Sequence, residues 1–181
     1  LSKKYHLNAL DESIWKFMRL RPANFPSIRL AQFAALVLKS YHLFSQILEI
    51  SDLKLLRHLF SDLPVNSYWK THFRFDKSSD QHTIQPGIGS LDNLLINSVA
   101  VFLFAYGRFH QVETYRLRAL KLLEEIAAEK NQVVNQFRNL GIIVANAAET
   151  QSLLQLKRNY CDEKKCLSCG IGNQILNKKS P

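Results

Sequence analysis

Three cysteines within nine residues give this chain its most distinctive chemistry. Cys161, Cys166 and Cys169 are the only cysteines in the 181 residues, and their spacing is C-x4-C-x2-C. A C-x2-C pair lets two thiolates reach one metal ion from a tight turn, and the neighbouring Lys164 and Lys165 favour the thiolate form that binds metal. We therefore expect the loop to bind zinc or an iron–sulfur cluster.

The fourth ligand of such a site stays open. Structural zinc sites use four ligands, and we select His72 as the candidate because it lies among aromatic residues in "YWKTHF". A cysteine outside this sequence or a water molecule could take its place, and C-x4-C-x2-C is also the spacing of the first three ligands in plant-type ferredoxins. The remaining interpretations are three free thiols or a disulfide, although an odd count argues against a complete disulfide framework.

The net charge of +9 is concentrated at the two ends of the chain. Residues 1–40 contain seven Lys/Arg against two acids, residues 157–181 contain six against two, and the part between them is neutral. Basic ends that meet in space would attract a polyanion such as nucleic acid, with Trp15 or Tyr160 free to stack on bases. The alternatives are an ordinary solvated surface, or arginines that brace a proline elbow at Pro22 and Pro26. The candidate nucleic-acid-binding residues are Arg19, Arg21, Arg29, Lys157, Arg158, Lys164 and Lys165.

Other functional classes have little support in the sequence. Glu124 and Glu125 are adjacent on a helix and point about 100° apart, so they do not form an acid–base pair. Neither "GIG" triplet belongs to a G-x-G-x-x-G motif. We predict no catalytic residue, and we do not expect this chain to be an enzyme by itself.

The longest apolar run, Val99–Tyr106, is shorter than the roughly 20 residues of a membrane-spanning helix. No signal-peptide pattern precedes it. We expect a cytoplasmic protein that does not contact a membrane.

The scarcity of glycine and proline, with apolar residues at steps of three and four, predicts an all-α fold. We expect an irregular bundle of about seven to nine helices that ends in the cysteine loop, as one domain over 1–181 with a possible hinge at 76–90. Gly107 is expected to end one helix, and Leu117, Leu120, Leu123 and Ile126 to form the buried stripe of the next. The segment around residues 68–75 fits neither helical nor strand periodicity. The expected helices cover 10–20, 28–40, 42–50, 52–61, 91–107, 112–129, 131–141 and 146–161.

Six strings along the chain carry a resemblance to a known family. They are "RPANFPSIRLAQFA", "WKTHFRFD", "LLINSVAVFLFAYG", "RALKLLEEIAAEKN", "TQSLLQL" and "YCDEKKCLSCGIG". Together they resemble the C-terminal half of the domain-of-unknown-function 2851 family, a bacterial family frequent in the Bacteroidetes. The family has no established activity to transfer, and Gly170 stands where the resemblance leads us to expect arginine.

The resemblance also implies a partner. Members of the family are longer and carry a preceding strand-rich region with acidic and histidine motifs similar to those of metal-dependent nucleases. Because this chain begins at Leu1, we expect it to be a fragment. Two functions follow as alternatives: an accessory domain that binds nucleic acid, or a scaffold domain that packs on this N-terminal region.

Overall fold

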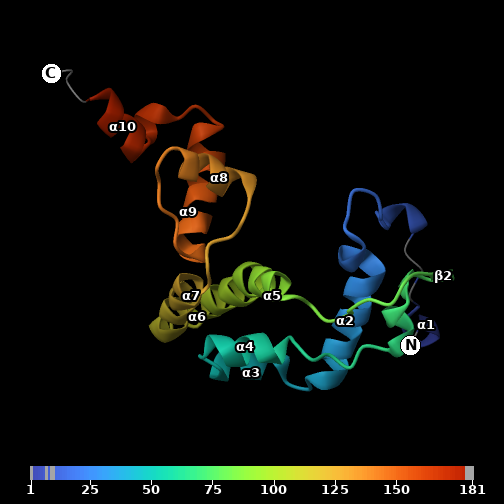
Figure 1. Ribbon diagram of the computed structural model, residues 1–181. Helices are drawn as coiled ribbons and strands as arrows, with labels where there is room; N and C mark the ends of the chain where they lie inside the picture. Colours follow the sequence, from blue (N-terminus) through green and yellow to red (C-terminus); the bar gives the residue numbers. More distant parts are fainter. Residues whose placement is uncertain (1, 7, 9–10, 178–181) are drawn as a thin grey trace. The chain divides into compact units, whose positions relative to one another are not determined.

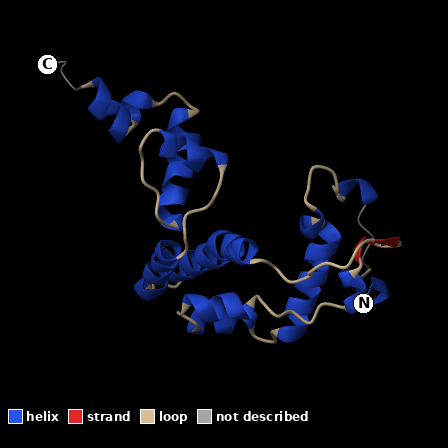
Figure 2. Cartoon of the chain, viewed as in Figure 1, coloured by secondary structure: helices blue, strands red, loops and turns tan. Residues whose placement is uncertain are grey.

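The chain divides into two units, each compact in itself. The computed structural model describes residues 2–6, 8 and 11–177. Unit 1 runs to Gln46 and resumes at Leu56–Leu91, and unit 2 contains Ile47–Leu55 and the chain from Asp92 onward. The predicted all-α class is confirmed, because helices dominate and one two-stranded hairpin is the only sheet in the described residues (Figure 1, Figure 2). The single domain expected over residues 1–181 stays a prediction.

Unit 1 is built around one long helix, and short elements surround it. The helix is α2 (Pro26–Lys39), which begins with proline at its first turn, where a missing backbone N–H costs nothing. Three further helices, α3, α4 and α5 (Ile88–Leu94), contribute residues to both units. The other elements are α1 (Ser2–Tyr5), η1 (Glu12–Ile14), η2 (Pro22–Asn24), α3 (Leu43–Glu49), α4 (Leu53–Leu59), η3 (Ser67–Lys70), β1 (His72–Arg74) and β2 (Lys77–Ser78).

The helix expected over residues 10–20 does not form in the described part of that segment. A single 3₁₀ turn, η1, is present instead. The Asp11 carboxylate accepts a hydrogen bond from the Ser13 backbone N–H at 2.8 Å. Hydrogen bonds from the Ser13 side chain and from this backbone N–H hold the pKa of Asp11 below its ordinary value. A short polar side chain thus captures a backbone donor locally, which competes with extension of the helix.

Two polar side chains of α2 attach the rest of unit 1 to it. The Ser27 hydroxyl donates to the carbonyl oxygen of Phe73 in β1 at 2.5 Å. The buried Gln32 amide donates to the carbonyl oxygen of Ile84 at 2.9 Å. Because buried polar groups are costly unless they are hydrogen-bonded, both contacts fix the path of the chain beside α2.

The segment 76–90, predicted as a possible hinge, is bonded within unit 1. The Gln85 side chain accepts from the Leu63 backbone N–H at 2.9 Å and donates to the Leu63 carbonyl at 2.8 Å. The His82 ring stacks on Phe73 with centroids 3.6 Å apart. These contacts, with the one from Gln32 to Ile84, attach the segment to unit 1. Its role as a hinge stays a prediction.

Unit 2 is a stack of helices in which α6 packs along α7, and α9 packs against both α7 and α8 (Figure 1). The segments α5, η4 and α6 form one continuous helix, of which η4 is a π-helical turn. The fully buried side chains of this unit include Leu95, Val99, Leu103, Ile126 and Val134. The bounds are α5 (Ile88–Leu94), η4 (Leu95–Ala100), α6 (Val101–Phe109), α7 (Glu113–Glu125), α8 (Gln132–Asn139), α9 (Ala147–Leu156), η5 (Lys157–Cys161), η6 (Cys166–Ser168) and α10 (Gly170–Leu176).

The continuous helix Ile88–Phe109 also passes a test for membrane-spanning segments. Among the described residues it is long and apolar enough to cross a membrane, judged by length and composition alone. From the sequence, only the uninterrupted apolar run Val99–Tyr106 was compared with the length of a membrane-spanning helix. Core helices of soluble proteins pass the same test, and this helix buries Leu95, Val99 and Leu103 within unit 2.

The buried face of α7 is displaced from the predicted stripe. Ala119 and Leu122 are buried, whereas Leu117 and Leu120 are 56% and 47% exposed. The buried residues of α7 are therefore a small side chain and a leucine outside the predicted stripe. Ile126, just beyond the end of α7, is buried as predicted.

Arg118 of α7 stabilises the end of α3 and the turn after it. Its guanidinium donates to the carbonyl oxygens of Ile47, Leu48 and Ile50 at 3.1, 2.5 and 2.6 Å. Such carbonyls lack partners at a helix C-terminus, where the helix dipole also favours a cation. One side chain therefore ties a segment of unit 2 to residues about 70 positions away.

Gly107 does not end its helix, contrary to the prediction. The helix continues to Phe109, and Gly107 lies where α6 approaches the start of α7. A Cβ atom at this position would lie 2.8 Å from the Val112 carbonyl oxygen and 3.0 Å from the Arg116 backbone nitrogen. The glycine is needed for this close contact rather than for a turn.

Replacing Gly107 with alanine should therefore destabilise the protein by about 1–3 kcal/mol, because backbone atoms must move to admit the methyl group. Urea unfolding followed by circular dichroism measures the change. Gly89→Ala is the matched control, since nothing lies within 4 Å of its Cβ position. That control should be neutral or stabilise the protein by up to about 1 kcal/mol. Equal effects of the two variants would contradict the close-contact explanation.

Candidate nucleic-acid interface and cysteine loop

The segment that could not be assigned from the sequence forms a small antiparallel hairpin in unit 1. His72 pairs with Ser78, and Arg74 pairs with Lys77. Asp76 at the tip has a φ of +56°, a left-handed conformation that aspartate tolerates better than most residues. Its backbone N–H donates to the Tyr68 hydroxyl at 3.1 Å. The turn is thus held by a residue that precedes the hairpin.

Aromatic rings gather on this hairpin. The Tyr68 ring stacks on the His72 imidazole with centroids 3.9 Å apart and planes 11° from parallel. The Phe75 ring lies 5.0 Å from Trp69 in an edge-on contact and 6.2 Å from Tyr68. Phe75 is nevertheless 71% exposed. The hairpin therefore presents an aromatic surface to solvent.

Basic side chains alternate with these rings. Lys70, Arg74 and Lys77 are all exposed. The Arg74 guanidinium lies 4.1 Å from the ring centroid of Phe17 and 5.2 Å from that of Phe25, which are cation–π distances. Unit 1 as a whole contains eleven Lys/Arg against five Asp/Glu, so it carries most of the net positive charge. We name residues 68–77 the aromatic–basic hairpin.

The three predicted arginines of unit 1 have different surroundings. Arg19 and Arg21 are exposed, whereas Arg29 is partly buried, which lowers the pKa of its guanidinium from the ordinary value. Arg29 thus has the bracing geometry that the sequence left as an alternative. Its guanidinium donates to the side-chain oxygens of Gln32 at 2.9 Å, Asn24 at 2.5 Å and Ser90 at 3.1 Å.

The four other predicted cations belong to unit 2 and flank the cysteine loop. Lys157 forms an ion pair with Asp162. Arg158 and Lys164 are exposed, and Lys165 lies 4.0 Å from Glu163. The two acids therefore partly neutralise the four cations of this group.

The cysteine loop is a compact turn between η5 and α10. Cys161 is the last residue of η5, Cys166 begins the 3₁₀ turn η6, and Cys169 precedes α10. The Cys166 carbonyl accepts from the Cys169 backbone N–H at 3.2 Å, which closes the C-x2-C turn. Lys164 has a φ of +53°. The last long helix therefore delivers Cys161 to the loop as predicted.

Gly172 explains how α10 can lie against this loop. A Cβ atom at Gly172 would lie less than 3 Å from the Cys166 carbonyl oxygen. Only glycine admits this approach without displacement of backbone atoms. The contact holds α10 to η6 beside the thiols.

The three thiols are free and do not form a preorganised metal site. Cys161 and Cys166 are exposed, and Cys169 is half-buried. No group of three or more His, Cys, Asp or Glu side chains in the part of the chain that the structure describes is placed to hold a metal ion. His72, the predicted fourth ligand, belongs to unit 1, where its Nδ1 lies 3.0 Å from the Tyr68 carbonyl oxygen. Metal binding by the loop stays a prediction.

The aromatic–basic hairpin was not among the sites predicted from the sequence. Its signal is visible in "YWKTHFRFDK", where aromatic and basic residues alternate over ten positions. Periodicity alone left the segment unassigned because a 3₁₀ turn and two very short strands share it.

A family model now identifies the chain as a member of a protein family of unknown function, DUF2851. The match covers residues 1–132, which include all of unit 1 with its hairpin, and confirms the predicted family. The cysteine loop lies beyond the matched residues. No curated protein and no solved structure matches the chain. The bacterial source and the place of the chain in a longer protein stay predictions.

If the loop binds metal, protein purified without chelator should contain about one zinc ion per chain, or iron with visible absorption if it holds a cluster. Elemental analysis and an absorption spectrum measure this. Cys166→Ser should remove the metal, and His72→Ala should lower its content if His72 is the fourth ligand. Ser168→Ala, in the same loop, is the control. Metal-free wild-type protein would contradict the prediction.

Proposed function

We propose that this chain is an accessory nucleic-acid-binding domain that holds a single strand on the aromatic–basic hairpin of unit 1. The observation that carries the proposal is the exposed Phe75 ring beside Tyr68 and Trp69, interleaved with Lys70, Arg74 and Lys77. The proposal places the interaction on one unit rather than on two basic ends brought together.

Stacking supports a single strand rather than a duplex as the ligand. Bases of a single strand are free to stack on aromatic rings, and such contacts tolerate any sequence because every base has a π face. Phe75 is at the tip of a two-stranded hairpin and is 71% exposed. A ring in this position can meet a base without rearrangement of the core of unit 1.

Charge supports the same ligand. Exposed lysines attract the phosphate backbone and displace its counterions, which makes binding weaken as salt is added. Lys70 and Lys77 flank the aromatic residues within ten positions. Arg74 is held by Phe17 and Phe25 through cation–π contacts. It therefore keeps its charge at the hairpin in a fixed position.

The cysteine loop has a supporting role in this proposal. A metal held by Cys161, Cys166 and Cys169 would fasten α10 to the end of η5 and so stabilise the C-terminal part of unit 2. The chain would then be a metal-stapled domain in which the metal is structural. The chemistry of three thiols within nine residues and the glycine contact at Cys166 support this part.

Binding to a fluorescein-labelled oligodeoxythymidine should weaken steeply with salt, as measured by fluorescence anisotropy. The double variant K70Q/K77Q should reduce the slope of log K against log salt by about 1.4, since each lost phosphate contact on a single strand contributes about 0.7. The double variant K54Q/K130Q removes the same charge from exposed positions of unit 2 and should leave the slope unchanged. Binding that is absent or independent of salt would refute the proposal.

Removal of the exposed ring should weaken binding without unfolding unit 1. Phe75→Ala is expected to cost about 1–3 kcal/mol of binding free energy, because one stacked base is lost. Phe109→Ala, which removes an 82% exposed ring from unit 2, should leave the affinity unchanged. If both variants bind like the wild type, the hairpin is not the interface.

A further inference from the structure

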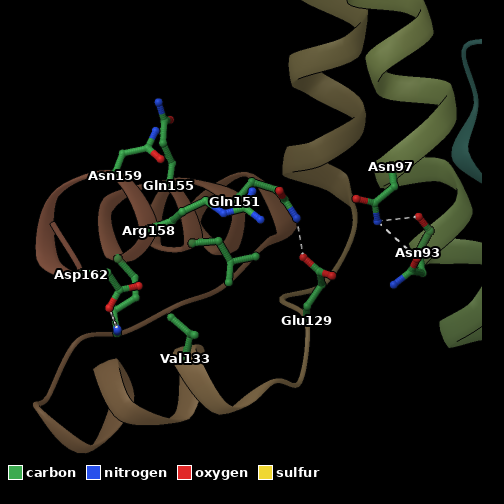
Figure 3. Close-up of a pocket in the computed structure, with 11 residues that line it drawn as sticks. Asn93, Asn97, Glu129, Val133, Gln151, Gln155, Arg158, Asn159 and Asp162 are labelled. Atoms are coloured by element: carbon green, nitrogen blue, oxygen red, sulfur yellow. Dashed lines mark hydrogen bonds and ion pairs between the residues drawn. The ribbon is translucent and has the colours of Figure 1, made fainter. Parts of the chain in front are cut away.

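Unit 2 contains a polar groove that the nucleic-acid proposal does not use. Its volume is about 670 Å³, and Figure 3 shows side chains from the α5–η4 helix, the loop after α7, α8, α9 and η5 around it. Nearly half of the lining residues are amides, an unusual concentration of one functional group. The five amides are Asn93, Asn97, Gln151, Gln155 and Asn159.

Two π-helical turns, the ones found in the described residues, border this groove. Asn97 belongs to η4, and Lys157, Arg158 and Asn159 belong to η5. In η5 the Asp162 backbone N–H donates to the Lys157 carbonyl five residues earlier, at 2.9 Å. Turns of this kind are rare and occur often at functional sites, because they re-aim side chains at a small cost in helix stability. Two such turns at one groove indicate that the backbone there is shaped for a function.

Several groove side chains are already held in position. The Asn97 amide donates to the Asn93 backbone and side-chain oxygens at 3.0 and 3.2 Å, which leaves the Asn97 oxygen as an acceptor and the Asn93 amide as a donor. The Glu129 backbone N–H donates to the buried Thr150 hydroxyl at 3.2 Å, and its carboxylate accepts from Gln151 at 2.7 Å. Figure 3 shows two of these pairs: Asn93 with Asn97 on the α5–η4 helix, and Gln151 of α9 with Glu129 of the loop after α7.

The charges of the groove distinguish it from the hairpin. Glu129 and Asp162 balance Lys157 and Arg158, so the groove has no net charge. A polyanion therefore gains little electrostatic binding free energy from this lining. A neutral ligand rich in hydrogen-bond donors and acceptors can instead bind through hydrogen bonds. The amide group of Asn or Gln presents one acceptor and two donors, which match the N–H and C=O of a peptide unit.

We propose that this groove binds an extended peptide segment of a partner protein through its main chain. The amides of Asn93, Asn97 and Gln155 pair with successive peptide groups of the segment. The apolar Val133 and Leu154 in the lining contact the carbon atoms of its side chains. The inference is independent of the nucleic-acid proposal, since it rests on other residues in another unit.

The test is a titration of the ¹⁵N-labelled full chain, in which nuclear magnetic resonance observes the side-chain NH₂ groups directly. The probe is an acetylated and amidated alanine–serine hexapeptide. We expect saturable shifts of the NH₂ resonances of Asn93, Asn97 and Gln155. The same hexapeptide with N-methylated peptide bonds should bind at least tenfold more weakly, because it lacks the N–H donors.

Variants separate a specific groove from a general surface effect. Asn97→Leu should abolish the shifts while the rest of the spectrum stays unchanged, and Asn135→Leu, at an exposed amide of α8 outside the groove, should not alter them. Absence of shifts, shifts confined to residues outside the groove, or equal shifts with the N-methylated peptide would overturn the proposal. Larger shifts at these residues with a thymidine dinucleotide would assign the groove to nucleic acid instead.

Discussion

The hydrogen bond from the Ser27 hydroxyl to the Phe73 carbonyl is the contact on which the candidate interface depends. A two-stranded hairpin is marginal in water by itself and needs packing against another element. Here the element is α2, to which Ser27 attaches β1 and Gln32 attaches the chain that follows the hairpin. The Arg74 guanidinium adds a third attachment through Phe17 and Phe25. These contacts give a short, exposed segment a fixed geometry.

The helical class could be predicted because amphipathic periodicity is a local property of the sequence. α3, α4 and α8 form within the expected ranges, and the Asp52 side chain caps α4 by accepting from the Leu55 backbone N–H. The buried face of α7 could not be predicted in this way. It depends on how closely α6 and α7 approach each other, as they do at Gly107, and this is a tertiary property.

The candidate sites also depend on tertiary contacts that local sequence patterns do not predict. The cysteine spacing identified a chemically special loop, yet the placement of a fourth ligand requires the tertiary structure, and His72 lies in the other unit. The groove of unit 2 gathers residues 93–162 from five segments, and no short motif marks it. The hairpin was closest to being predictable, since its residues are consecutive. Its aromatic and basic alternation is a signal of composition rather than of periodicity.

The left-handed backbone at Asp76 has an evolutionary consequence. With a φ of +56°, the hairpin tip accepts glycine, asparagine or aspartate at little cost and disfavours β-branched residues. Variation at the tip should therefore alternate among these three residues wherever the hairpin is retained. A relative without that restriction should form a different type of β-turn at the hairpin tip. The ring at position 75 would then have a different orientation.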